Sequence, residues 1–135
     1  MTESPLRVLL AEDDDHLASL VGTILDGDGR FIVVGRAKTG DDAVVLCAEH
    51  EPDIVLMDIG MPVRDGIDAT RAIHTRDPAQ HVVIYTGSDE YSDVARAEDA
   101  GAVGYLHKDA LTSPDVADAL HVLHANYVSS VPDPD

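Results

Sequence analysis

Short apolar runs alternate with helical patterns along the chain. The apolar runs, which are typical of buried strands, lie at residues 6–11, 31–34, 54–57, 82–85 and 103–106. Between the first two runs, apolar residues recur from Leu17 to Leu25 at i, i+3, i+4, i+7 and i+8 spacing. That period predicts an amphipathic helix, so the chain begins with a strand followed by a helix.

Caps and breakers indicate the later helices. Thr39 with Asp42 three residues later resembles a capping box and predicts a helix to about residue 50, before Pro52. A weaker helical segment reaches about residue 74, and an alanine-rich one reaches about residue 100. For the last helix, Ser113 is the predicted N-cap and Pro114 the first helical residue. Its apolar stripe, which should face the sheet, consists of Val116, Leu120, Leu123 and Tyr127.

Five strand and helix pairs of this kind predict an α/β fold. Parallel neighbouring strands need right-handed crossovers, so the expected architecture is a doubly wound parallel sheet with helices on both faces. In such sheets ligands bind beyond the carboxyl ends of the strands. The residues that directly follow each apolar run are therefore the candidates for a functional site.

Length and charge narrow the class of protein. A chain of 135 residues, 44% hydrophobic and 26% charged, matches a single globular domain. Its 9 Lys+Arg against 26 Asp+Glu give a formal net charge of −17. A chain this negative is poorly suited to contacts with nucleic-acid phosphates. No apolar run approaches the roughly 20 residues of a membrane span, and the first residues lack the pattern of a signal peptide. We therefore expect a cytoplasmic protein that binds neither nucleic acid nor membrane.

The cysteine and the histidines predict no site of their own. Cys47 is the single cysteine, so no intrachain disulfide can form, and its apolar neighbours favour a small buried residue. His121 and His124 are three residues apart on the last predicted helix, but no third ligand is evident for a metal. Exposed histidines beside an apolar stripe are more often solvated, which is the interpretation we adopt for this pair.

Polar residues lie just after four of the predicted strands. They are Glu12, Asp13 and Asp14 after the first strand, Asp58 after the third, Thr86 after the fourth and Lys108 after the fifth. If the first and third strands are neighbours, about 4.8 Å apart, Asp13 and Asp58 face each other across one gap. Carboxylates so close need a counter-charge, and Mg²⁺ supplies it with carboxylate, carbonyl, water and phosphate ligands. With a lysine and a hydroxyl nearby, the set predicts a place that receives a phosphoryl group.

Each of these residues also has an ordinary structural interpretation. The three acidic residues after the first strand could be a helix N-cap cluster, and Asp58 a turn residue. Thr86 and Lys108 alone would be a turn hydroxyl and a surface cation. The functional interpretation is favoured because all of them fall at the carboxyl ends of strands and none at the amino ends.

The same segments resemble the receiver domain of bacterial two-component response regulators over nearly the whole chain. The matching stretches run from Val8 to Asp14, from Asp53 to Pro62 with Asp65 and Gly66, from Val82 to Thr86, and from Gly101 to Lys108. The resemblance implies a CheY-like, flavodoxin-like sheet with strand order 2-1-3-4-5. It also implies a receiver domain over residues 1–128 that acts as a signalling switch and is not an enzyme.

The resemblance further implies a role for each candidate residue. Asp58 matches the phosphoacceptor, which takes its phosphoryl group from a sensor histidine kinase, and Lys108 matches the lysine paired with it. The implied Mg²⁺ ligands are Glu12, Asp13, Asp58 and the carbonyl of Gly60. Thr86 and Tyr105 match the switch pair. Gly60 and Gly87 are smaller than the residues often found at these positions in the family.

The segment after the lysine favours one branch of the family. Asp109 stands where many members have proline, a form that resembles the NarL/FixJ branch, whose members usually carry a C-terminal helix-turn-helix domain. Residues 129–135, which end in Val-Pro-Asp-Pro-Asp, have the composition of a tail or linker. We therefore expect transcriptional output through such a domain outside this chain, and a homodimer is one way in which phosphorylation could act.

Two other functions compete with the switch. A Mg²⁺ phosphatase of the haloacid dehalogenase type would use the Asp-x-Asp of residues 13–15, but Leu17 stands where that motif needs Thr or Val, and Asp58 would have no role. A flavodoxin-like cofactor binder would need a glycine-rich phosphate loop after a strand, which the sequence lacks, and the charge of −17 would repel an anionic cofactor.

Overall fold

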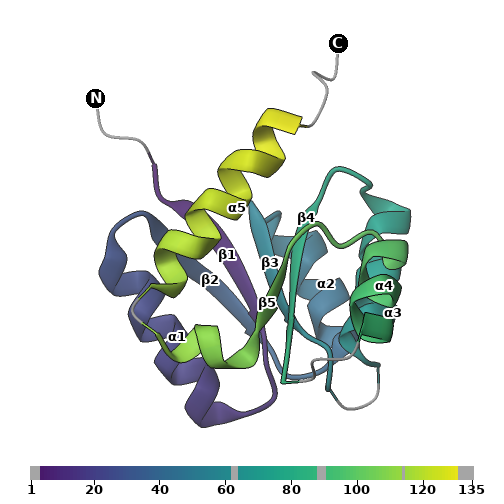
Figure 1. Cartoon of the computed structure of the whole chain (residues 1–135), viewed down its shortest axis with the longest axis horizontal. Coiled ribbons are helices and arrows are strands. Elements are labelled where there is room, and N and C mark those ends of the chain that lie inside the picture. The colour runs from purple at the N-terminus through teal and green to yellow at the C-terminus, as the bar shows by residue number, and fades with distance from the viewer. Residues whose placement is uncertain (1–3, 62–63, 88–90, 114, 131–135) are drawn as a thin grey trace.

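The chain folds into one five-stranded parallel sheet with helices on both faces (Figure 1). The computed structural model describes residues 4–61, 64–87, 91–113 and 115–130. The strands are β1 (Leu6–Ala11), β2 (Phe31–Ala37), β3 (Ile54–Asp58), β4 (His81–Thr86) and β5 (Tyr105–His107). Their order, β2-β1-β3-β4-β5, confirms the predicted fold class and strand order.

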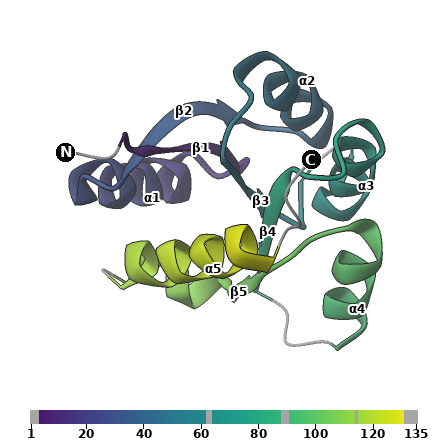
Figure 2. The ribbon, with the colours of Figure 1, turned by 90° about the horizontal axis from the view of Figure 1, so that it is seen from above.

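The helices are divided between the two faces of the sheet. They are α1 (Asp15–Asp28), α2 (Gly40–His50), α3 (Gly66–Arg76), α4 (Tyr91–Ala100) and α5 (Val116–Ser130), with a 3₁₀ helix, η1 (Lys108–Thr112), after β5. From above, α1 and α5 cover one face, and α2, α3 and α4 cover the other (Figure 2). No helix in the described part of the chain is long and apolar enough for a bilayer crossing.

Each face of the sheet has its own apolar core because strand residues alternate between the two sides. Leu9, Val55, Met57 and Ile84 point into the core under α2, α3 and α4. Val8, Leu10, Ile54, Leu56 and Val83 point into the core under α1 and α5. All residues of β3 and β4 are buried, as the apolar runs predict.

Polar side chains cap the amino ends of α1 and α2. Asp14 is the N-cap of α1, where its Oδ1 accepts hydrogen bonds from the amides of His16 (2.9 Å) and Leu17 (3.1 Å). Those bonds lower the pKa of the Asp14 carboxyl, the Leu17 amide contributing most. Thr39 caps α2 through the Asp42 amide at 3.1 Å, as predicted. Cys47 is buried on α2, also as predicted.

Several boundaries differ from the predictions. β2 continues to Ala37, three residues beyond the apolar run. Arg36 is tolerated in this edge strand because its Nε donates to the carbonyl of Glu12 (3.0 Å) and its Nη1 pairs with Asp15 (2.7 Å). β5 begins at Tyr105 instead of residue 103, since Gly104 has a φ of 119° that interrupts regular extended backbone.

The start and end of α5 also differ. The helix begins at Val116, and the Ser113 Oγ accepts a 3.2 Å hydrogen bond from the Asp115 amide, while Pro114 lies outside the described residues. The predicted stripe from Val116 to Tyr127 does face the sheet, with Val116 and Leu120 buried. Helix geometry continues to Ser130, two residues into the segment that we predict to be a tail. The division at residue 128 stays a prediction.

The prediction that His124 is solvated is wrong. Its Nδ1 lies 3.0 Å from Nδ1 of His81, which is 1% exposed at the start of β4. The other nitrogen of His81, Nε2, lies 2.7 Å from the carbonyl of Val103 and must carry a proton, because a carbonyl only accepts. Burial, the main cause, lowers the pKa of His81 to about 4, so its Nδ1 accepts from the N–H of His124. Tyr127 stacks on His81 at 4.2 Å, which ties α5 to β4.

We expect this histidine contact to make stability depend on pH. The pKa of His81 is about 4 in the fold against 6.5 for the free side chain, so stability is present above pH 6.5 and is lost as the pH falls toward 4. His81→Phe keeps the ring but cannot titrate. The difference in unfolding free energy between wild type and variant, measured by urea titration, should shrink by up to about 3 kcal/mol from pH 7 to pH 4. A constant difference would contradict the assignment.

Candidate functional site

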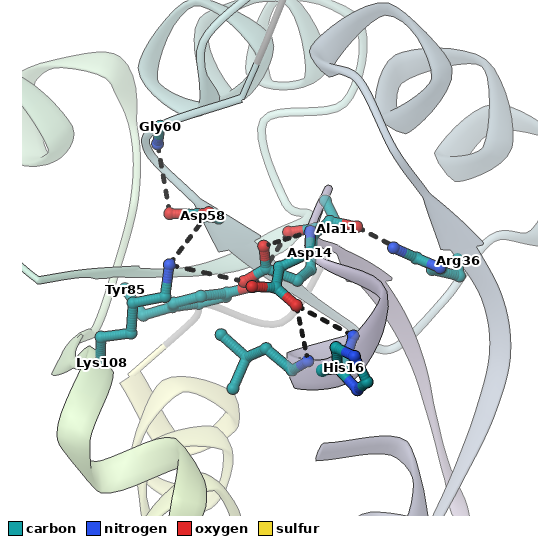
Figure 3. Close-up of polar contacts among 10 residues, drawn as sticks. Ala11, Asp14, His16, Arg36, Asp58, Gly60, Tyr85 and Lys108 are labelled. Carbon is teal, nitrogen blue, oxygen red and sulfur yellow. Dashed lines mark hydrogen bonds and ion pairs between the residues drawn. The ribbon is translucent and has the colours of Figure 1, made fainter. Parts of the chain in front are cut away.

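The polar residues that follow the strands meet at the carboxyl edge of the sheet, as predicted. The register pairs Ala11 of β1 with Met57 of β3, so Glu12 and Asp58 are the next residues on neighbouring strands. Asp58 in turn pairs with Tyr85 of β4, one residue before Thr86. Lys108 reaches the same edge from the start of η1 (Figure 3).

Three carboxylates lie within reach of one another. Glu12, Asp13 and Asp58 each offer an oxygen, and these oxygens all lie within 4.8 Å of one another. Glu12 and Asp58 are buried, whereas Asp13 is exposed. Oxygen donors of this kind, one side open to solvent, fit a hard divalent cation such as Mg²⁺, which takes few protein ligands and keeps several waters.

Glu12 is held on both of its carboxylate oxygens. Oε2 accepts a hydrogen bond from the amide of Asp14 at 2.9 Å, and Oε1 accepts one from the hydroxyl of Tyr85 at 2.8 Å. Burial, the largest cause, raises the pKa of Glu12, and the charge of Asp58 adds to the increase. The two hydrogen bonds and the charge of Lys108 oppose it. A cation at this site would favour the ionised form further.

Asp58 is positioned by the loop that follows β3. Its Oδ1 accepts a hydrogen bond from the amide of Gly60 at 3.2 Å, and its Oδ2 lies 3.8 Å from Nζ of Lys108. The same Nζ lies 3.9 Å from Oε1 of Glu12, so the lysine charge is shared between two carboxylates. Both separations are longer than a hydrogen bond, and the side chain of Lys108 is half-exposed.

A glycine is required where this loop turns into α3. The amide of Gly66 donates to the carbonyl of Ile59 at 2.9 Å, which brings the loop back against the strand. A Cβ on Gly66 would lie 2.0 Å from the carbonyl oxygen of Asp58, a contact that backbone cannot relieve cheaply. The close approach of α3 therefore depends on Gly66 and helps to define where Asp58 sits.

Thr86 and Tyr105 lie on the adjacent strands β4 and β5. Thr86 is the last residue of β4 and is 8% exposed, and it pairs in register with His107. Tyr105 is half-buried at the start of β5 and packs against the core under α2, α3 and α4. Gly60, whose carbonyl is the predicted fourth ligand, is exposed. Pro62 of the matching motif lies outside the described residues.

The structure differs from the sequence-based expectation at Tyr85 and Asp14. The sequence pattern identifies Tyr85 only as part of an apolar strand, yet its hydroxyl donates a hydrogen bond to Glu12. A tyrosine at the end of a buried strand, whose hydroxyl needs a partner, was the available signal. Asp14 belongs to the helix cap, so the ordinary interpretation holds for this residue of the acidic run.

Comparison with known proteins agrees with this geometry. A sequence model of the response regulator receiver domain matches residues 8–121. The chain is 37% identical over 114 residues to the chemotaxis protein CheY of Halobacterium salinarum, covering 84% of this chain and 92% of that protein. It is 42% identical over 104 residues to the transcriptional regulatory protein PdtaR of Mycobacterium tuberculosis, covering 77% of this chain but only 50% of PdtaR.

A solved structure shows the same fold. The signal receiver domain of the putative response regulator NarL from Mycobacterium tuberculosis superimposes with a TM-score of 0.85 at 28% identity, covering 91% of this chain and 98% of that one. The order of the strands, the acidic cluster at their carboxyl edge and the match over residues 8–121 agree with one another. The chain belongs to the response regulator receiver domain family of two-component systems.

Proposed function

We propose that this chain accepts a phosphoryl group on Asp58 from a phosphohistidine of a sensor histidine kinase. The observation that carries the proposal is the buried carboxylate of Asp58, which lies beside two further carboxylates and 3.8 Å from Lys108. An oxygen of Asp58 attacks phosphorus, the bond from phosphorus to the histidine nitrogen breaks, and the histidine keeps the electron pair. Lys108 lies where it can attract the transferred phosphoryl oxygens.

Mg²⁺ is the proposed cofactor of this step. Glu12, Asp13 and Asp58 with the carbonyl of Gly60 would hold it, and the ion would offset the charge that builds up between two anions. The protein contributes the placement: the loop amide of Gly60 orients one oxygen of Asp58, and the buried environment of Glu12 and Asp58 excludes water on the core side.

Thr86 and Tyr105 are the proposed switch. A phosphoryl group adds about −1.5 to −2 charge and new acceptor oxygens. The hydroxyl of Thr86, at the end of the neighbouring strand, would move toward them, and Tyr105 would turn inward into the space that this leaves. The surface formed by α4, β5 and α5 would change as a result.

Output is proposed to lie in another domain. PdtaR, of which this chain spans half, is named a transcriptional regulatory protein. The Lys108-Asp109 form favours a C-terminal helix-turn-helix domain joined through residues 129–135. A chain with a net charge of −17 would be repelled by DNA, so we propose that this part signals through receiver pairing or contacts with that domain and is not itself an enzyme or a DNA reader.

Phosphorylation should be observable without a kinase. Acetyl phosphate with Mg²⁺ should label wild type on Asp58, because acetate is a good leaving group and the ion offsets the charge of the two anions. Chelation of Mg²⁺ or the substitution Asp58→Asn should abolish labelling. Mass spectrometry of the treated protein locates the phosphoryl group, and a label on Asp13 would instead support the phosphatase alternative.

Removing one carboxylate should stabilise the protein when no divalent cation is present. Asp58→Asn keeps an acceptor for the Gly60 amide but removes like-charge repulsion, so the unfolding free energy in a chelator should rise by about 1 kcal/mol. Added Mg²⁺ should then stabilise wild type more than the variant. Asp99→Asn, an equal charge change at an exposed position, is the control and should have little effect. A lower unfolding free energy for Asp58→Asn than for wild type would contradict net repulsion between the carboxylates of the cluster.

The switch should be visible in hydrogen exchange. Beryllofluoride, a phosphoryl mimic, should change amide protection within residues 86–108 when Mg²⁺ is present, because Thr86, α4 and Tyr105 shift together. Protection of β1 and β3, which form the centre of the sheet, should stay the same. Equal protection of residues 86–108 with and without the mimic would count against the switch.

A further inference from the structure

Tyr85 places a polar group deep inside the molecule, directly beneath the acidic cluster. The side chain is fully buried near the end of β4. Its hydroxyl donates to Oε1 of Glu12 at 2.8 Å and lies 3.1 Å from the carbonyl of Ala11. A phenol has one proton, and the shorter contact is to the charged acceptor, which forms the stronger bond.

This hydroxyl restrains the carboxylate of Glu12 on the side that the backbone does not reach. The amide of Asp14 holds Oε2 at 2.9 Å, whereas Nζ of Lys108 is 3.9 Å from Oε1 and too distant for a hydrogen bond. Two donors at opposite oxygens leave a carboxylate little freedom to rotate. Each oxygen still has a further lone pair, so a cation can be bound while both hydrogen bonds persist.

We propose that Tyr85 is a positioning residue for the metal site, acting through Glu12. The inference rests on the proposed function, since it takes Glu12 as a metal ligand. Partners that orient a metal ligand are worth about 10–100-fold in metal affinity or activity. An apolar residue would fill the strand position equally well, but it would leave Oε1 of Glu12 free to turn away from Asp13 and Asp58.

Tyr85→Phe tests the proposal because it removes the hydroxyl and keeps the ring. Mg²⁺ binding to the full chain, measured by calorimetry, should weaken about 10-fold or more. The matched control is Tyr127→Phe, which removes a hydroxyl bonded to the carbonyl of Ala79, away from the site. Its Mg²⁺ affinity should equal that of wild type.

The labelling reaction gives a second readout that loss of packing alone would not reproduce. In Tyr85→Phe, the Mg²⁺ concentration that gives half-maximal labelling by acetyl phosphate should rise by the same factor as the dissociation constant. The labelling rate at saturating Mg²⁺ should return close to that of wild type. A lower rate at every Mg²⁺ concentration, with unchanged half-saturation, would overturn the proposal.

A double-mutant cycle with Glu12→Asp isolates the contact itself. The shorter side chain draws the carboxylate away from the hydroxyl but can still bind a cation. In the Glu12→Asp background, Tyr85→Phe should therefore change Mg²⁺ affinity less than twofold, because the interaction is already lost. An equal loss of affinity in both backgrounds would mean that Tyr85 acts on the fold and not through Glu12.

Fluorine spectroscopy covers the case in which Tyr85→Phe does not fold. A chain with the other three tyrosines replaced by Phe and with 3-fluorotyrosine at Tyr85 keeps the hydroxyl, and its single ¹⁹F resonance should shift with Mg²⁺ at the calorimetric midpoint. A ¹⁹F chemical shift that does not change with Mg²⁺ concentration would overturn the proposal. If wild type neither binds Mg²⁺ nor is labelled on Asp58, the proposed function itself is refuted. This result distinguishes failure of the proposed function from failure of the proposal for Tyr85.

Discussion

The burial of two carboxylates side by side, Glu12 and Asp58, is the constraint on which the rest of this structure depends. An ionised group removed from water is stable only where hydrogen bonds and opposite charge replace the lost solvation. Here the donors come from the loop after β1, from the loop after β3 and from β4, while the lysine charge comes from η1. The strand register must bring these separate segments to one edge.

That dependence explains how much the sequence could predict. The apolar runs require buried strands, and the helical segments between them require parallel crossovers, so the architecture and the edge that carries the site follow from the pattern. Residues that act at a strand end, such as Asp58, could be found because polar residues follow several strands at the same edge of the sheet, whereas one such residue alone would be an ordinary turn residue. The close approach of α3 at Gly66 could not, since it depends on the path of one loop.

The contacts that escaped prediction share a physical cause. Tyr85 and His81 both lie in a strand that is apolar overall. The hydroxyl of Tyr85 and the two ring nitrogens of His81 bond residues that are distant in sequence. Periodicity describes which face of an element is buried, but it carries no information on which partner satisfies a buried polar atom. The contact of His124 escapes prediction for the same reason, because only the packing of α5 on β4 brings it to His81. β2 extends past its apolar run because Arg36 bonds Glu12 and Asp15 in the segment after β1.

The histidine and tyrosine stack at the start of β4 has a mechanical consequence. Tyr127 and His124 attach the C-terminal half of α5 to the amino edge of the sheet, the end opposite to Asp58. Turning that half of the helix would separate stacked rings and break the bond between the two histidines. The C-terminal half of α5 is therefore held in place on the sheet. Any movement of α4 and β5 changes their position relative to this half of the helix, and a neighbouring protein that contacts both could detect the change.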